Sequence, residues 1–272
     1  MIRFLPLLAA AVFAACSPAP GPQQQAQSAP TMFPDGELVD LSHVYDGTTI
    51  FWPTSERFRL DKVADGVTPA GYYYAANNFS TAEHGGTHID SPVHFSQGAQ
   101  TVDQIPLDRL VGPVVIVDVV AQSEGNADYQ VTIDDVMRAE EEGPIPSDAI
   151  VLIRTGFSRR WPDAARYLGT AARGEAAVRN LHFPGLHPDA ARWLVANRQI
   201  KAIGIDTASI DYGQSTLYES HRVLFEQNIP AFENLTQLDR LPLRGAFIVA
   251  LPMKIGGGSG APLRAIAILP RG

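Results

Sequence analysis

Three histidines and one aspartate fall within a short stretch of this sequence, at His84, His88, Asp90 and His94. Imidazole nitrogens and a carboxylate at such short range form a donor set suited to Zn²⁺, Mn²⁺ or Fe²⁺. Two histidines and one aspartate would leave coordination positions open for water, as a catalytic site requires. A structural metal site and an ordinary glycine turn flanked by histidines are the alternatives to catalysis here.

The spacing also predicts how the chain runs through this cluster. An extended strand would hold His84 and His88 roughly 13 Å apart, too far for both to bind one ion. Gly85 and Gly86 allow the chain to bend between them, because glycine tolerates positive φ. His88 and Asp90, two positions apart, can then share one face of a strand.

Apolar runs of strand length alternate with helical patterns in the rest of the chain. Helices are predicted at 132–141, where Thr132 and Asp135 have capping-box spacing, at 188–197 and at 216–227. Strands interleaved with helices indicate an α/β domain of mixed sheet order. The strands are predicted at 113–119, 149–154, 200–205, 246–251 and 264–269.

The composition narrows the class of protein. The chain has 272 residues, with 21 Lys+Arg against 29 Asp+Glu, and its formal net charge of −8 argues against a nucleic-acid binder. Cys16 is the one cysteine, so any metal must be held by histidines and carboxylates rather than by thiolates.

The first residues indicate export. A short basic start precedes an apolar run from Phe4 to Phe13, which is typical of a secretory signal peptide over 1–15. About ten apolar residues are too few to span a membrane. The residues up to Cys16 resemble a bacterial lipobox, so Cys16 is the expected lipidation site of a periplasmic, membrane-anchored lipoprotein; an ordinary signal peptide with an incidental cysteine is the alternative.

Residues 16–36 are rich in proline and glutamine and nearly uncharged, so we expect them to form a tether. No internal repeat or second linker follows, so residues 37–272 are predicted to form one domain. Within that domain, Gly256–Gly260 looks like a phosphate loop but lacks the Lys-Ser/Thr that should follow it. We expect this segment to be a flexible loop near the site.

The segment from His84 to Phe95, HGGTHIDSPVHF, closely resembles the signature of the putative cyclase family. This family comprises metal-dependent hydrolases and includes bacterial kynurenine formamidase and isatin hydrolase. The resemblance covers most of residues 37–272. It implies a single-domain swivelling β/β/α-type fold, with a mixed, partly barrel-like sheet and flanking helices, and a homodimer. Further similar segments are Ile105-Pro-Leu, Phe183-Pro-Gly-Leu, Gly204–Ser209 and Glu233-Asn-Leu.

The resemblance also implies a set of metal ligands. The first ion would be bound by His84, His88 and Asp90, and a second, where present, by Asp90 with His221 and Glu233. His221 lies on the apolar face of a predicted helix, where a histidine is more often a plain core residue. Glu233 would be costly to bury without a partner, and a metal would satisfy both side chains.

Three further residues gain roles from the resemblance. His94 corresponds to the family's catalytic histidine, and titration near neutral pH would suit it as a proton shuttle. Phe51 and Trp52 match the aromatic segment that the family places over its substrate, although an aromatic residue before proline is as often core. His43, His182 and His187 have no ligand-like partner at close spacing, and we expect His187 to cap a helix.

The expected chemistry is hydrolysis of a C–N amide bond. A divalent ion, Zn²⁺ or Mn²⁺, at one or two sites per subunit, would lower the pKa of bound water and polarise the carbonyl group. The first hypothesis is an arylformamidase that cleaves N-formylkynurenine, a step of tryptophan catabolism. The alternatives are opening of a cyclic amide such as isatin, and a tethered binding protein that captures a ligand without turnover.

Overall fold

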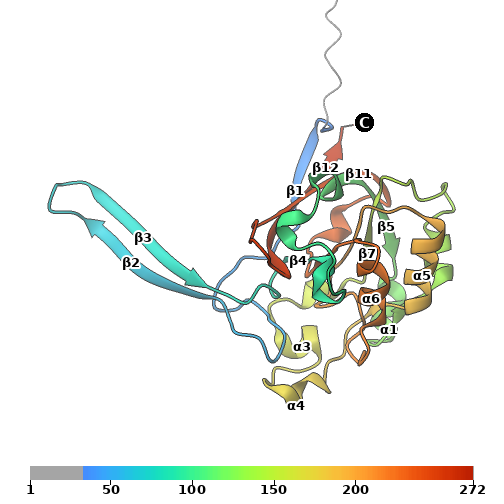
Figure 1. Ribbon diagram of the computed structural model, residues 1–272, viewed down its shortest axis with the longest axis horizontal. Coiled ribbons are helices and arrows are strands. Elements are labelled where there is room, and N and C mark those ends of the chain that lie inside the picture. The colour runs from blue at the N-terminus through green and yellow to red at the C-terminus, as the bar shows by residue number, and fades with distance from the viewer. Residues whose placement is uncertain (1–32, 272) are drawn as a thin grey trace, which may run out of the picture. The chain divides into compact units, whose positions relative to one another are not determined.

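The computed structural model describes residues 33–271, which belong to one compact unit beginning at Phe33 (Figure 1). The predicted signal peptide over 1–15 and the lipidation site at Cys16 lie outside the described residues. The first strand, β1, covers Gly36–Asp40, close to the predicted start of the domain. Within the described part of the chain, no helix is long and apolar enough to cross a membrane.

Seven of the eight strands in the main sheet of the described residues close into a ring, and β1 pairs with β12 from outside it. Strands β5, β7, β9 and β10 run parallel, and the remaining neighbours pair antiparallel. The ring confirms the predicted α/β fold with a mixed, barrel-like sheet. In ring order the strands are β12 (Gly260–Pro270), β11 (Arg244–Pro252), β5 (Val111–Asp118), β7 (Ile150–Arg154), β9 (Ala202–Ile205), β10 (Ala231–Glu233) and β4 (His88–Asp90).

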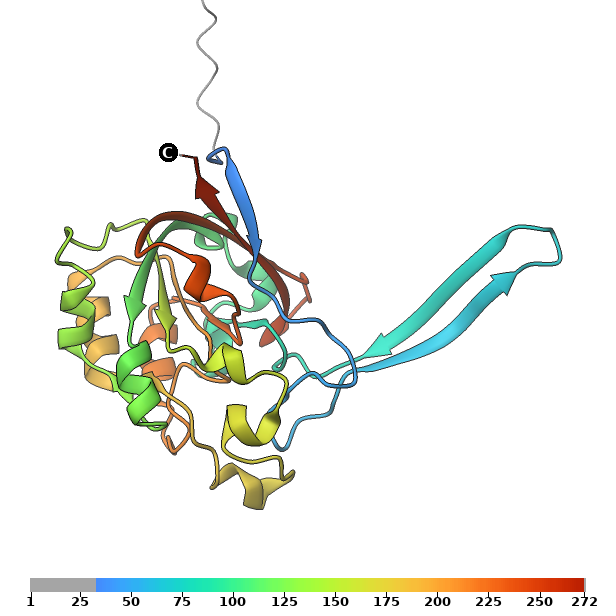
Figure 2. The same ribbon diagram turned by 180° about the vertical axis from the view of Figure 1, so that it is seen from behind.

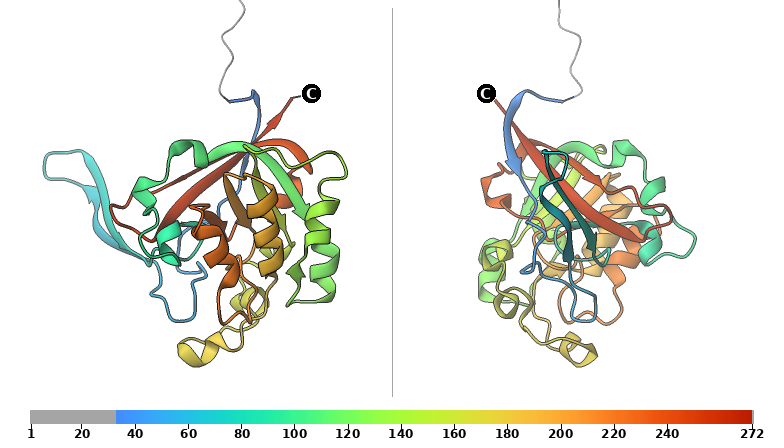
Figure 3. Two further views of the ribbon diagram at one scale, coloured as in Figure 1. Left: turned by 45° about the vertical axis from the view of Figure 1, so that its right-hand side comes forward. Right: turned by 90° about the vertical axis from the view of Figure 1, so that its left-hand side faces the viewer.

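Three of the strands marked by continuous apolar runs, β5, β7 and β9, are buried on both faces, whereas β11 alternates between buried and partly exposed residues. In β5, Val114 and Ile116 belong to one core cluster, whereas Val115 and Val117 belong to a second cluster beneath the helices. Strands covered on both faces need apolar residues at every position, which explains the runs. The covering helices are α2 (Ile133–Arg138), α5 (Pro188–Asn197) and α6 (Glu219–Phe225), seen together in Figure 3.

All three predicted helices are present, but α2 ends at Arg138 rather than at 141, and α6 is shorter than predicted at both ends. Helix α5 has the predicted bounds, and α2 begins after Thr132 with the predicted capping box, in which Thr132 and Asp135 bond each other's backbone N–H. Helix α6 begins at Glu219 rather than near 216. Tyr218 just before it has φ 48°, a left-handed conformation that cannot continue an α-helix.

Strands β2 (Arg59–Val67) and β3 (Tyr73–Ser80) form a hairpin that projects away from the body of the domain (Figures 1 and 2). Both strands are exposed along most of their length, so the sequence carries no apolar run to mark them. The remaining α-helices and strands are α1 (Val120–Gly125), α3 (Ala164–Leu168), α4 (Glu175–Val178) and the paired strands β6 (Gln130–Val131) and β8 (Gly185–Leu186).

Candidate active site

Two three-residue strands, β4 and β10, carry three of the five candidate ligands where the ring closes. They pair antiparallel, and His88 lies directly opposite Glu233. Ile89 and Phe232 belong to the core cluster, and successive side chains of a strand point to opposite faces. His88, Asp90 and Glu233 therefore share the other face, as predicted for the first two.

The chain bends between His84 and His88, and their ring centroids lie 5.5 Å apart. Gly86 has φ +56°, and a Cβ atom there would lie 2.6 Å from the ring of Tyr45. The Tyr45 hydroxyl donates a hydrogen bond to the carbonyl oxygen of Gly85 at 2.5 Å. The two glycines thus serve the bend as predicted, and Tyr45 packs against it.

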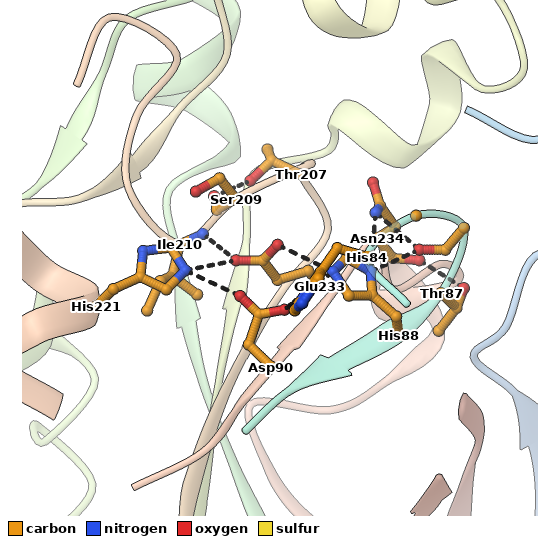
Figure 4. Close-up of polar contacts among 12 residues, drawn as sticks. His84, Thr87, His88, Asp90, Thr207, Ser209, Ile210, His221, Glu233 and Asn234 are labelled. Carbon is orange, nitrogen blue, oxygen red and sulfur yellow. Dashed lines mark hydrogen bonds and ion pairs between the residues drawn. The ribbon is translucent and has the colours of Figure 1, made fainter. Parts of the chain in front are cut away.

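The first group of donor atoms comes from His84, His88 and Asp90, and all its atoms lie within 4.8 Å of one another. Asp90 Oδ1 lies 2.7 Å from His84 Nδ1 and 3.1 Å from His88 Nε2 (Figure 4). His88 and Asp90 are buried, and His84 is half-buried. The assignment of these side chains as ligands stays a prediction.

The second group combines Asp90 with His221 and Glu233, and all three side chains are buried. His221 Nε2, on α6, lies 3.2 Å from Asp90 Oδ2 and 3.1 Å from Glu233 Oε1 (Figure 4). The backbone N–H of Ile210 donates to Glu233 Oε1 at 2.8 Å and orients this carboxylate. Asp90 therefore offers one oxygen to each group.

Burial and neighbouring charges shift the pKa values of Asp90, Glu233 and His221. Burial raises the pKa of Asp90, but His84, His221 and His88 outweigh burial and hold the pKa well below its usual value. Burial and the neighbouring charge of Asp90 both raise the pKa of Glu233. Burial lowers the pKa of His221, but the carboxylates around that ring raise it well above its usual value.

These observations fit a divalent cation. Two buried carboxylates, Asp90 and Glu233, lie close enough for one to raise the pKa of the other. Among the described residues that line the cavity around them, none is a lysine or an arginine. A divalent ion would neutralise this pair, and imidazole with carboxylate is a donor set that Zn²⁺ and Mn²⁺ accept.

Hydrogen bonds fix which ring nitrogen of two histidines faces the cluster. His88 Nδ1 lies 2.9 Å from the carbonyl oxygen of Gly86, which can only accept, so Nδ1 carries the hydrogen. His221 Nδ1 lies 2.5 Å from Asp211 Oδ2. In each neutral ring, Nε2 keeps the lone pair that a metal binds. Sequence reasoning missed Asp211, because nothing in its local spacing marks a partner of His221.

Aromatic side chains line a cavity of about 280 Å³ that also contains both donor groups. Phe51 and Trp52 lie there, so the segment predicted over the substrate does share a cavity with the candidate ligands. The Tyr218 ring lies 5.1 Å from Phe95 and 6.5 Å from Trp52, measured between centroids. Sequence reasoning missed Phe95 and Tyr218, although Phe95 ends the histidine-rich signature.

His94 lines the same cavity, and its ring stacks on His84 with centroids 3.9 Å apart. Burial, assisted by His84, His221 and His88 and opposed by Asp90, lowers the pKa of His94 to about 4. This corrects the near-neutral titration predicted from the residue type alone. Because burial disfavours the charged form of the ring, the His94 imidazole is uncharged at pH 7.

The other histidines lie outside both donor groups. His182 pairs with Asp128, and His187 accepts the backbone N–H of Asp189 and so caps α5, as predicted. His43 stacks on Trp161 with centroids 4.0 Å apart.

Comparison with known proteins places the chain in a family. Residues 39–212 match the family model described as "Putative cyclase". An isatin hydrolase of Roseibium aggregatum is 31% identical over 251 residues, which cover 86% of this chain and 92% of the relative. A kynurenine formamidase of Salinibacter ruber is 29% identical over 236 residues, 84% of this chain and 96% of the relative.

Solved structures agree with the sequence relatives. Isatin hydrolase A from Ralstonia solanacearum superposes with a TM-score of 0.77 and 33% identity, covering 86% of this chain and 92% of that chain. The names of these relatives confirm the prediction of a hydrolase that acts on amide C–N bonds other than peptide bonds. The chain belongs to the putative cyclase family.

Proposed function

We propose that this chain hydrolyses the C–N bond of a compact aromatic amide, using divalent ions held by the two donor groups that share Asp90. One observation carries the proposal: both groups and four aromatic side chains line a single cavity. A Zn²⁺ or Mn²⁺ ion held there, at one or two sites per subunit, supplies a water nucleophile of lowered pKa and polarises the carbonyl group.

His94 is the proton carrier in this proposal. Its uncharged ring lies against His84 in the cavity, so it can accept the proton that the attacking water releases. The same proton then passes to the leaving nitrogen, which would otherwise depart as a high-energy anion. No serine or cysteine nucleophile is needed for this sequence of steps.

Trp52, Phe95 and Tyr218 hold the aromatic part of the substrate. Their rings stand next to one another along the cavity wall, where a flat ring can stack or meet an edge. The cavity of about 280 Å³ suits a ring system of modest size. Such contacts orient the amide toward the donor groups.

The lining favours an uncharged cyclic amide such as isatin over an amino-acid formamide such as N-formylkynurenine. The amino-acid group of N-formylkynurenine carries a carboxylate, which would need a cationic partner. None of the described residues that line the cavity is a lysine or arginine that could pair with this carboxylate. Isatin has no carboxylate, so it needs no cationic partner.

The test compares hydrolysis of isatin and N-formylkynurenine by the full chain reconstituted with Zn²⁺ or Mn²⁺, with His94→Ala as the control. We expect the wild type to hydrolyse isatin and the His94→Ala variant to lose this activity. Hydrolysis of the formamide alone would overturn the proposed substrate preference but would still support the assignment as an amide hydrolase. Bound metal with hydrolysis of neither amide would favour the tethered binding protein.

We further propose that the chain forms a homodimer, and the β2–β3 hairpin supports this. Its cross-strand pairs include Leu60 with Phe79 and Val67 with Tyr73, and all four side chains are more than half exposed. A second copy would cover these apolar side chains. Light scattering of the full chain should give the mass of a dimer, and the double variant Tyr73→Asp, Phe79→Asp should give that of a monomer.

Export and lipid anchoring at Cys16 are also part of the proposal, and they rest on the sequence of residues 1–36. The short basic start, the apolar run and the lipobox-like residues before Cys16 support them. We expect the protein in the detergent phase of a membrane extract. Cys16→Ala should move it to the aqueous phase, and a variant that still partitions into detergent would contradict lipidation.

A further inference from the structure

The glycine-rich segment Gly256–Gly260 contacts the candidate metal ligand His84 directly. Ser259 Oγ lies 2.9 Å from His84 Nε2 and 2.6 Å from Glu83 Oε2. The backbone N–H of Ser259 donates to the same Glu83 oxygen at 3.0 Å. The segment therefore binds two consecutive residues at the start of the histidine-rich signature.

The directions of these hydrogen bonds follow from the number of available protons. The Ser259 hydroxyl has one hydrogen, and an ionised Glu83 carboxylate can only accept, so the hydroxyl donates to Glu83. The remaining lone pairs of Ser259 Oγ can accept from His84, so Nε2 of that ring carries its hydrogen. In the neutral ring, Nδ1 then keeps the lone pair that a metal ion would need. Nδ1 lies 2.7 Å from Asp90 Oδ1, and a cation bound by both atoms would replace the proton that a direct hydrogen bond between them requires.

Two glycines leave the space that this arrangement requires. A Cβ atom on Gly260 would lie 2.5 Å from Cε1 of His84, and one on Gly258 would lie 2.9 Å from Glu83 Oε1. Both distances are too short for real Cβ contacts. A Cβ on Gly256 would meet nothing within 4 Å. Glycine is therefore required at the positions that face His84 and Glu83, for reasons of packing.

Hydrogen bonds from the segment after the signature hold the loop in place. The Ser91 hydroxyl and the Val102 backbone N–H both donate to the carbonyl oxygen of Gly258, at 3.0 Å and 2.9 Å. The Gly257 N–H donates to Asp103 Oδ1 at 2.9 Å. This corrects the expectation of a flexible loop, because the glycines serve close packing and the backbone is bonded at several points.

We propose that Ser259 and Glu83 are positioning residues that fix His84 with Nδ1 toward the first ion and so set the affinity of that site. The proposal rests on the metal-dependent function proposed above. Hydrogen-bond partners of this kind typically contribute 10- to 100-fold to metal affinity. His88 and His221 have their own partners, Gly86 and Asp211, so the effect should be confined to the first ion.

The test measures the Zn²⁺ affinity of the full chain by competition with a chromophoric chelator. Ser259→Ala should weaken Zn²⁺ binding at the first site, the one that contains His84, by about 10- to 100-fold. Ser259→Thr keeps the hydroxyl and should restore this affinity. Ser123→Ala is the matched control, because the buried Ser123 hydroxyl has no hydrogen-bond partner within the described residues. Gly260→Ala should weaken binding as well, whereas Gly256→Ala should not.

Nitrogen-15 spectra of the histidine rings separate positioning from a general loss of structure. In the Zn²⁺-loaded wild type, His84 should show a protonated Nε2 and a metal-shifted Nδ1. Ser259→Ala should change the His84 signals while those of His182, which lies outside both donor groups, remain unchanged.

The outcomes distinguish the two proposals. Equal Zn²⁺ affinity in wild type and Ser259→Ala, with hydrolysis intact, would overturn the positioning role alone. A wild type that binds Zn²⁺ but hydrolyses neither amide would overturn the hydrolytic function, while the affinity comparison would still decide the role of Ser259. A wild type that binds no Zn²⁺ would overturn both.

Discussion

Asp90 turns its Oδ2 atom toward His221 Nε2, at 3.2 Å, while its Oδ1 atom faces the histidines of the other donor group. One carboxylate thus links two sets of donors that come from distant parts of the chain. Because both sets need its negative charge, Asp90→Asn should abolish binding of both ions.

The matched variant is His221→Ala, which removes a donor from one set only. Metal analysis by mass spectrometry should show no bound Zn²⁺ in Asp90→Asn, and in His221→Ala the loss of one of the two ions that a fully loaded wild type binds. Equal metal loss in the two variants would contradict the role of Asp90 as the shared ligand.

His94→Ala should lower kcat by about 10²- to 10⁴-fold, the usual contribution of a positioned proton carrier. The bound metal should stay unchanged, because His94 belongs to neither donor group. Steady-state kinetics together with metal analysis test this. A kcat close to that of wild type would remove His94 from the chemistry, whereas loss of metal would make it a ligand.

The stability of the metal-free protein should fall as the pH rises above about 7. Burial lowers the pKa of His221, but Asp211, Asp90 and Glu233 raise it well above 6.5. A group whose pKa is raised on folding contributes stability that is fully present below its unfolded pKa and lost as the pH passes its folded pKa. His88 has a raised pKa for a similar reason.

Urea denaturation in the presence of a chelator, at about pH 6 and about pH 9, measures this trend. Zn²⁺-loaded protein is the control, and its stabilisation by metal should increase with pH because metal binding displaces protons from the histidines. Metal-free protein that is more stable at the higher pH would contradict the assigned titration of His221.

Asp211→Asn should weaken the second site by about 10- to 100-fold. Asp211 accepts from His221 Nδ1 at 2.5 Å and from the backbone N–H of Ser220 and His221, so it fixes both the ring and the start of α6. An asparagine can present its NH₂ group instead and leave the ring free to turn.

The same chelator competition measures the effect of Asp211→Asn. Asp128→Asn is a suitable control, since Asp128 pairs with the exposed His182 outside both donor groups. Unchanged affinity in Asp211→Asn would show that packing alone holds His221.

The sequence by itself determined the local features of this protein. The bend at Gly85–Gly86, the capping box at Thr132 and the bounds of α5 depend on residues close in the chain, so their pattern predicts them. Strands buried on both faces also show in the sequence, because burial requires an apolar residue at each position. The histidine-rich signature also predicted the first donor group, because His84, His88 and Asp90 lie close together in the chain.

Only the tertiary structure decided which residues far apart in the sequence contact each other. Asp90 and His221, which only the family resemblance had linked, are 131 residues apart, and Ser259 and His84, which nothing in the sequence had linked, are 175 apart. Their contacts depend on the pairing of β4 with β10 and β12, which no local pattern encodes. The low pKa of His94 likewise arises from neighbours that converge only on folding, because burial and electrostatic interactions depend on distance in space rather than along the sequence.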